Sequence, residues 1–226
     1  MRRVLTTIIA IDTMLLDIHS HRAAPYPQGV VSEEPQPGFR PLDGQSCSLG
    51  LHPWHSDSPD ADAILDRVRQ LAARPCVAAI GECGVDPGRG APLYRQLLQF
   101  KRQVEISETV GKPLVIHAVK AADTIIGVHT DLAATRPWAI HGFRGKPTVA
   151  QMYLRAGLWL SFGERFNPDA LRAMPRDRIL AETDDSRLTI QQILALQARA
   201  LGIPAAEYTA MIAANTARFL GICEIG

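Results

Sequence analysis

Eight short apolar runs recur along this 226-residue chain, and most of them are followed by a segment whose apolar residues have helical spacing. Runs such as residues 76–81 are continuous rather than alternating, which is typical of parallel strands covered on both faces. The predicted strands are Leu15–Ile18, Val30–Val31, Cys47–Leu51, Cys76–Gly81, Leu114–Ile116, Trp138–Ile140, Leu158–Ser161 and Ile179–Ala181.

Helical segments separate most of these strands, and Gly or Pro residues mark several of their ends. Helices are predicted at about residues 60–72, 92–110, 121–132, 148–156, 167–174, 189–201 and 204–214. Residues 22–45 are instead rich in Pro and Gly and show no helical period, so we expect no helix between the first two strands. Regular alternation with eight strands predicts an α/β fold, a (β/α)8 TIM-type barrel, in a single domain over residues 14–226.

The first strand leads into two histidines one residue apart, His19 and His21. Successive side chains of an extended strand point to opposite faces, so these two emerge on the same side and can close on one cation. Taken alone, such a pair is more often two exposed histidines without a ligand than a metal site. Its meaning depends on the residue types at the ends of the other strands.

Further ligand-type residues stand at the ends of later predicted strands in the same way. The carboxyl ends of barrel strands converge on one face, so residues far apart in sequence become neighbours there. A single buried histidine would more often be a hydrogen-bonded core residue, but burying six such groups together is costly unless cations compensate them. Two divalent ions bridged by a carboxylate would do so. The six residues are His19, His21, Glu82, His117, His141 and Asp184.

Several short motifs together give the chain a resemblance to a known family. They are Asp17–His21, Leu49–Trp54, Gly81–Asp86, Pro113–His117, His141–Gly145 and Glu182–Asp184. As a set, and in this order from about Met14 onward, they resemble the TatD family of metal-dependent nucleases, within the amidohydrolase-like metallohydrolases. The resemblance implies a two-metal site. By it, one divalent ion would be held by His19, His21, Glu82 and Asp184, and the second by Glu82, His117 and His141.

The chemistry of such a site fits hydrolysis. A water shared by two cations loses its proton near neutral pH, and the cations neutralise charge that builds on phosphate oxygens. Asp184 and Glu82 are the predicted catalytic residues, with Asp184 orienting the water and accepting its proton. Asp17, two residues before His19, is expected to support the ligands. Mixed histidine and carboxylate sites accept Mg, Mn or Zn, with Fe also compatible, so the metal identity stays open.

The loops depart from the family pattern. Asp86 is followed by residues 87–89, Pro-Gly-Arg, where the family usually has aromatics, and Val119 and Lys120 replace a usual arginine. The basic loop expected after Asp184 is cut to residues 185–187. These trimmed loops weaken an assignment to DNA more than an assignment to metal.

Three residues are predicted to contact substrate, namely His52, Arg144 and Lys146. The arginine fork suits bidentate contact with phosphate. For Arg144 and Lys146 a solvated loop is an equally good interpretation. Trp54 has the chemistry to stack on a base, but we expect it to cover the barrel instead.

Composition and charge limit the class of protein. A net charge of +1 and 46% hydrophobic residues are ordinary for a soluble globular chain, so any phosphate site must be local. Cys47, Cys76, Cys83 and Cys223 form no Cys-x-x-Cys pair and are expected to be free thiols in a reducing cytoplasm. No apolar run reaches the roughly 20 residues that span a bilayer, so no membrane partner is expected.

Residues 1–13 are interpreted as an N-terminal extension, with Met14 a candidate start. The basic beginning and the apolar run Val4–Ile11 resemble a secretory signal. Asp12 interrupts that run, and no small-residue cleavage site comes after it, which argues against a signal.

Our leading hypothesis is a cytoplasmic, monomeric metal-dependent hydrolase, a TatD-type deoxyribonuclease or phosphodiesterase that acts on DNA ends or small phosphodiesters. The alternative is a metal-dependent hydrolase of a carboxyl ester or amide, such as an aminoacyl ester or a lactone, because the same metal cradle polarises a carbonyl equally well. A third hypothesis is a non-catalytic binding protein, against which the intact ligand set argues.

Overall fold

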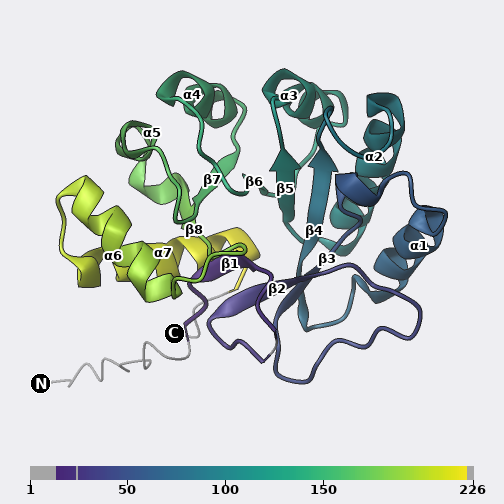
Figure 1. Ribbon diagram of the computed structural model, residues 1–226, viewed down its shortest axis with the longest axis horizontal. Helices are drawn as coiled ribbons and strands as arrows, with labels where there is room; N and C mark the ends of the chain where they lie inside the picture. Colours follow the sequence, from purple (N-terminus) through teal and green to yellow (C-terminus); the bar gives the residue numbers. More distant parts are fainter. Residues whose placement is uncertain (1–13, 24, 223–226) are drawn as a thin grey trace, which may run out of the picture.

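The computed structural model describes residues 14–23 and 25–222, so the proposed extension and Cys223 lie outside the described residues. Eight parallel strands form one sheet in the order β1 to β8. A backbone bridge between Ser20 and Asp184 joins the two edges of that sheet. The result is a nearly closed barrel with helices on its outer side (Figure 1), which confirms the predicted (β/α)8 TIM-type fold.

The strands are short, and most of their residues are buried. They are β1 (Asp17–Ser20), β2 (Gly29–Glu33), β3 (Cys47–Leu49), β4 (Val77–Val85), β5 (Leu114–Ala118), β6 (Trp138–Ile140), β7 (Trp159–Phe162) and β8 (Ile179–Ala181). All pairings between sequential neighbours are parallel. This arrangement places every carboxyl end on one face of the barrel.

The helices pack their apolar faces against the outside of the sheet. They are α1 (Ala61–Leu71), α2 (Leu93–Val110), α3 (Ala122–Asp131), α4 (Pro147–Arg155), α5 (Pro168–Arg172), α6 (Ile190–Leu201) and α7 (Ala205–Leu220), with short 3-10 turns η2 (Pro53–His55) and η3 (Arg176–Arg178). Asn167 caps α5 as its sequence predicts, and Gly111 ends α2 in the left-handed conformation. Helix α7 runs six residues beyond the predicted end at Ala214, because Phe219 extends its buried face.

Two layers of apolar side chains hold the barrel together. The larger cluster fills the space between strands and helices, and includes Phe100 and Trp138. A smaller cluster contains Val115 and Ala139, which lie two residues before His117 and His141 and therefore face the same side of the sheet. This inner cluster fills the barrel interior directly beneath the histidines.

Within the described residues the barrel has no helix between β1 and β2, as predicted, and none between β2 and β3. The loops there are held instead by the side chain of Gln45, which is 4% exposed. Its Nε2 lies 3.0 Å from Gly29 O and 2.7 Å from Ser46 O, and its Oε1 accepts from the backbone N–H of Tyr26. One glutamine thus satisfies backbone groups that would otherwise be buried without partners.

Replacing Gln45 by alanine should lower the free energy of unfolding by about 2–4 kcal/mol, because several buried backbone groups lose their partner at once. Chemical denaturation measures this loss. The matched control is Gln36→Ala in the same loop, where the exposed side chain donates to Glu34 at the surface. That change should cost less than about 0.5 kcal/mol, and equal losses in the two variants would contradict the role of Gln45.

Candidate metal centre and active site

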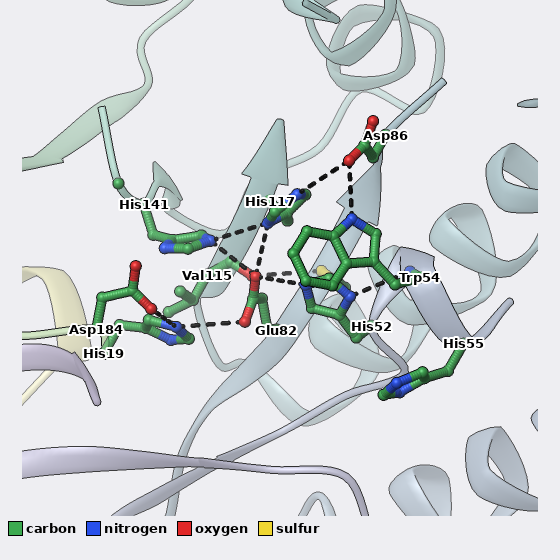
Figure 2. A network of polar contacts seen from close by, with 12 residues as sticks. His19, His52, Trp54, His55, Glu82, Asp86, Val115, His117, His141 and Asp184 are labelled. Atoms are coloured by element: carbon green, nitrogen blue, oxygen red, sulfur yellow. Dashed lines mark hydrogen bonds and ion pairs between the residues drawn. The ribbon is translucent and has the colours of Figure 1, made fainter. Parts of the chain in front are cut away.

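The six predicted ligands converge at the carboxyl face of the barrel, around the carboxylate of Glu82. Figure 2 shows His19, His117, His141 and Asp184 beside this carboxylate. Its Oε1 lies 2.8 Å from His117 Nδ1 and 2.8 Å from His141 Nε2. Its Oε2 lies 3.3 Å from His19 Nε2 and 3.5 Å from His21 Nε2. Residues from β1, β4, β5 and β6 therefore meet at one carboxylate, as their positions along the strands suggest.

Glu82 lies inside β4 and does not end it, so the prediction that the strand stops before Glu82 is wrong. Residues Cys83–Val85 continue to pair with β5, after an irregularity in register between Ile80 and Cys83. Two glycines let the strands approach closely here. A Cβ on Gly81 would lie 2.4 Å from Val115 O, and a Cβ on Gly50 would lie 2.5 Å from Glu82 O. Close packing of the backbone at the site therefore requires glycine at these two positions.

His52 joins this group of histidines, although it was predicted to contact substrate. Its Nε2 lies 2.8 Å from Glu82 Oε1, and its Nδ1 accepts the backbone N–H of Trp54. The latter bond fixes the orientation of the ring. Together with Glu82 and His117, His52 has ligand atoms close enough to one another to hold a metal ion. Five imidazole rings therefore surround one carboxylate.

Asp184 lies beside the His19 and His21 pair. Its Oδ1 is 3.8 Å from His19 Nε2 and 3.7 Å from His21 Nε2. Its backbone is in the left-handed region, with φ of 53°, and is held there by hydrogen bonds with the backbones of His19 and His21. Burial raises the pKa of this carboxyl, and the nearby Glu182 adds to the rise. Such a carboxylate is a stronger proton acceptor than an exposed aspartate.

Strong electrostatic coupling links Glu82 and His141. Burial alone would raise the pKa of Glu82, but the neighbouring His141 and His19, with a hydrogen bond from His117, hold it well below the usual range. Burial would lower the pKa of His141, but Glu82 and Glu182 raise it well above the usual value. In the metal-free protein the charge of Glu82 is therefore balanced by a proton on His141.

The donor set fits divalent cations. Both ring nitrogens of His19, which is fully buried, lack a hydrogen-bond partner among the described residues, while Nε2 faces the Glu82 carboxylate. Buried imidazole nitrogens normally have a partner, and a cation shared with a carboxylate supplies one. Three candidate ligand groups overlap through Glu82 or His19. They are His19, His21 and Glu82; His19, His141 and Asp184; and His52, Glu82 and His117.

Asp17 acts on the backbone and not on the His19 ring. Its Oδ1 accepts the backbone N–H groups of His19 and Thr183, both at 3.1 Å, and its Oδ2 accepts the Thr183 hydroxyl at 2.6 Å. The carboxyl therefore ties the end of β1 to the residues after β8, where the barrel closes. Burial raises the pKa of Asp17 to about 7, despite the hydrogen bonds from Thr183 and His19 that lower it.

Several supporting residues were not predicted. Glu182 Oε1 lies 3.5 Å from His141 Nδ1 and accepts the Gly142 N–H at 2.6 Å, so it orients His141. Asp86 accepts the Trp54 indole N–H at 2.8 Å and lies 3.8 Å from His117 Nε2. Both acids belong to the motifs on which the family resemblance rests, Gly81–Asp86 and Glu182–Asp184. Their place in these motifs was the sequence signal that could have identified them as supporting residues.

Three buried glutamines on one face of α2 hold the loops that carry these side chains. Gln103 accepts the N–H of Leu51 at 2.8 Å, directly before His52. Gln96 accepts the N–H of Asp86 at 2.8 Å and donates to its carbonyl, and Gln99 donates to Ser56 O. Positions 96, 99 and 103 share a helix face, but a helix predicted from the spacing of apolar residues gives no indication that these polar residues are buried.

A cleft of about 500 Å³ opens over the ligands. Arg144 and Arg165 line it, and Arg144 Nη2 lies 3.9 Å from Asp184 Oδ2. Lys146 is exposed directly before helix α4 and is not among the residues that line the cleft. The structure therefore brings Arg144 to the site but not Lys146. Trp54 also lines the cleft, and the Arg89 guanidinium lies 3.7 Å from its ring centre, which supports its interpretation as a cover.

Comparison with known families and sequences points in one direction. The profile of the family described as TatD related DNase matches residues 42–221. A protein of Erwinia billingiae named 3'-5' ssDNA/RNA exonuclease TatD is 32% identical over 147 residues, which cover 61% of this chain and 56% of that protein. A Mycobacterium tuberculosis protein named uncharacterized metal-dependent hydrolase TatD is 30% identical over 156 residues, with 63% and 59% covered. The chain thus spans little more than half the length of these curated relatives.

Solved structures show the same fold. YJJV, a TatD homologue from Escherichia coli K12, superimposes with a TM-score of 0.79 at 20% identity, covering 95% of this chain and 100% of that one. A TatD family hydrolase from Entamoeba histolytica gives a TM-score of 0.73 at 12% identity, with 93% and 99% covered. At these identities the likeness concerns the arrangement of strands and helices.

The pKa of Asp17 predicts how the metal-free protein responds to pH. Its carboxyl binds a proton more tightly in the folded than in the unfolded state, so wild-type stability should fall relative to Asp17→Asn as pH rises from about 4 to about 7. The difference should reach the order of 3 kcal/mol and then level off. Urea denaturation across this range measures it.

Asparagine keeps the acceptor for the two N–H groups, and the Thr183 hydroxyl can donate to Ser20 Oγ instead, 2.8 Å away. Asp17→Ala removes the acceptor and should be less stable than Asp17→Asn at every pH. A wild-type minus Asn difference that does not change between pH 4 and pH 7 would show that Asp17 is charged in the folded state.

Metal binding should release protons, because His141 must be neutral to act as a ligand and its pKa is raised well above the usual value. Titration calorimetry with Mn or Zn at pH 7, in two buffers of different ionisation enthalpy, should show about one proton released. Apparent affinity should accordingly rise with pH. An enthalpy that is the same in both buffers would contradict the assigned charge of His141.

Proposed function

Because this chain belongs to the family of TatD-related DNases, we propose that it is a metal-dependent hydrolase that cleaves phosphodiesters at single-stranded nucleic acid ends or in small molecules. The observation that carries the proposal is the Glu82 carboxylate in contact with five imidazoles, beside Asp184. Relatives named as ssDNA/RNA exonucleases and as metal-dependent hydrolases support it. The fold places this group at the carboxyl face of the barrel, where catalysis occurs in such folds.

We assign two overlapping ligand sets, for two divalent ions that share Glu82. One set is His19, His21, Glu82 and Asp184, and the other is Glu82, His117 and His141, with His52 as a further ligand. This mixture of nitrogen and carboxylate donors suits Mn or Zn. Mg is better matched to sites with fewer histidine ligands. Bound ions would polarise the phosphoryl oxygen and acidify a water in the cleft.

The chain itself supplies proton transfer and orientation. Asp184 has its side chain 22% exposed to the cleft and a raised pKa, so it can accept a proton from the attacking water and return it to the leaving oxygen. Glu182 and Asp86 orient His141 and His117 from behind. Arg144, half exposed beside Asp184, is placed to contact a phosphate oxygen. Trp54 covers one wall of the cleft.

A carboxyl ester remains the second candidate substrate, for a specific reason. A cavity of about 390 Å³ on the other side of Glu82 is lined by Glu33 and Glu34, together with His21 and His52. Burial raises the pKa of Glu33, and Glu34 accepts from His52 N and lies 2.9 Å from His55 Nδ1. This acidic wall disfavours a second phosphate and would accept an ammonium group, as in an aminoacyl ester.

We also propose that residues 14–226 act as one domain, that the protein is a monomer, and that it works in the cytoplasm. Cys47 and Cys83 are buried free thiols, which suits a reducing compartment. The exposed large apolar side chains are spread over several elements, and the one neighbouring pair among them is Tyr94 and Leu98 on α2. No helix in the described part of the chain is long and apolar enough to cross a membrane.

Glu82→Gln and Asp184→Asn should each lower kcat by at least about 10³-fold, because the first removes the shared charge and the second the proton acceptor. Turnover is measured with metal added back to chelated protein. The panel comprises single-stranded DNA, duplex DNA, RNA, a small phosphodiester, an aminoacyl ester and a lactone. Far-ultraviolet circular dichroism checks that both variants are folded.

The proposed function predicts cleavage of single-stranded nucleic acid or the small phosphodiester by the wild type, with duplex DNA a poor substrate. Carboxyl-ester turnover without phosphodiester cleavage would replace it by the second candidate. No turnover on the whole panel, with metals bound, would favour a binding protein. Activity retained in either variant would remove that residue from the catalytic set.

A further inference from the structure

A second cavity, of about 300 Å³, lies beside the metal-centre cleft on the side of β6, β7 and β8. Asp184, Gly142, Arg144 and Arg165 border both spaces, so the two are contiguous. The position is where TIM-type barrels frequently bind phosphate, in the loops after the last two strands. None of the six ligand histidines and carboxylates except Asp184 lines it.

Three arginines line this cavity, one from each of three successive loops. Arg144 comes after β6, Arg165 after β7 and Arg187 after β8. Arg144 is 3.9 Å from Asp184, but within the described residues no carboxylate lies within ion-pair distance of Arg165 or Arg187. Both side chains are exposed to the cavity and to solvent. Two guanidinium groups are therefore available for an anion.

The loops that carry these two arginines are fastened to each other. Ser186 Oγ donates to Glu164 Oε2 at 2.7 Å, which links the residues beside Arg187 to those beside Arg165. Leu188 N donates to Ser186 Oγ at 3.0 Å, and the Arg22 guanidinium donates to the carbonyl of Leu188. These bonds fix the backbone on both sides of Arg187 and engage the carboxylate of Glu164, the residue directly before Arg165 in the sequence. The backbone beside Arg187, and its link to the loop of Arg165, is therefore in place before any ligand binds.

Charge differs between the two sides of the metal centre. The β6 to β8 cavity is lined by three arginines and also by four acids, Glu164, Glu182, Asp184 and Asp185, whereas the β2 to β3 cavity is lined by Glu33, Glu34 and Glu82 and by no arginine or lysine. Of the two cavities, the one on the β6 to β8 side therefore offers guanidinium groups to a second phosphate, while the other offers carboxylates without a cationic side chain beside them. A cavity of about 300 Å³ is at the small end of ligand pockets, which suits one phosphate group with part of its sugar.

We propose that Arg165 and Arg187 form a subsite for a second phosphate group of the substrate, the neighbour of the one that is cleaved. Planar guanidinium forks make paired hydrogen bonds to phosphate oxygens, which a single lysine does not. The inference rests on the proposed phosphodiesterase function. It adds that the substrate extends from the metal centre toward the β6 to β8 side of the barrel. It makes the protein selective for a phosphate-bearing nucleotide over a simple diester.

Binding to metal-free protein tests the subsite without catalysis. The probes are thymidine 3',5'-bisphosphate, thymidine 5'-monophosphate, thymidine 3'-monophosphate and thymidine, each titrated by calorimetry. The bisphosphate should bind, and Arg165→Ala and Arg187→Ala should each weaken it roughly tenfold, the loss of one charged hydrogen bond. The monophosphate that binds with the higher affinity shows whether the 3' or the 5' phosphate occupies the subsite.

Arg199→Ala is the matched control, because it removes an equal charge from the exposed last turn of α6, about 15 Å along the helix from its start after β8. It should bind the bisphosphate as the wild type does. Equal affinity of wild type, Arg165→Ala and Arg187→Ala would overturn the subsite, as would an equal loss in all three variants.

Kinetics then separate this inference from the proposed function. The metal-loaded wild type should cleave a dinucleotide that carries a terminal phosphate at least about tenfold more efficiently than the same dinucleotide without it, and the double variant should lose this ratio. Cleavage by the wild type with a ratio near one would overturn the subsite while the function stands. No cleavage of any diester, with binding of the bisphosphate still weakened in the variants, would overturn the function while the subsite stands.

Discussion

The buried carboxylate of Glu82 is the group on which the rest of this structure depends. It is 5% exposed and is surrounded by histidines from β1, β3, β5 and β6 or from the residues directly after them. A carboxylate in such a place is costly unless opposite charge compensates it. In the metal-free protein the proton on His141 does so, and divalent cations would take over that role. Charge balance at one residue thus couples the barrel to its chemistry.

Closure of the barrel serves the same site. The Asp17 carboxyl joins β1 to Thr183, and the Ser20 to Asp184 bridge joins the first strand to the last. These contacts hold His19 and Asp184 side by side, although they are 165 positions apart in the sequence. The glutamines of α2 do the same for His52 and Asp86 on the opposite side. Polar groups at the mouth of the barrel are therefore fixed from strands and helices.

The sequence pattern was sufficient to predict the barrel and the convergence of the ligands. Apolar runs mark the strands, and the carboxyl ends of barrel strands meet on one face. It did not show that Glu82 lies within β4, because the irregularity in pairing with β5 has no local signature. His52 was predicted to contact substrate, which stays a prediction, but its hydrogen bond to Glu82 was not predicted because it depends on the path of the loop after β3. Lys146 was predicted to contact substrate, but it does not line the cleft; a basic residue beside a helix start has the same sequence pattern whether it faces a cleft or solvent.

Crystallography of the protein soaked with manganese, with anomalous data collected near the metal edge, tests the central claim most directly. The account predicts two anomalous peaks, one on each side of the Glu82 carboxylate and about 3.5–4 Å apart, with His19 and His21 at one and His117 at the other. Glu82→Gln crystals should lose at least one of them. A single peak away from Glu82, or two peaks that Glu82 does not touch, would contradict the claim that this carboxylate organises a two-metal site.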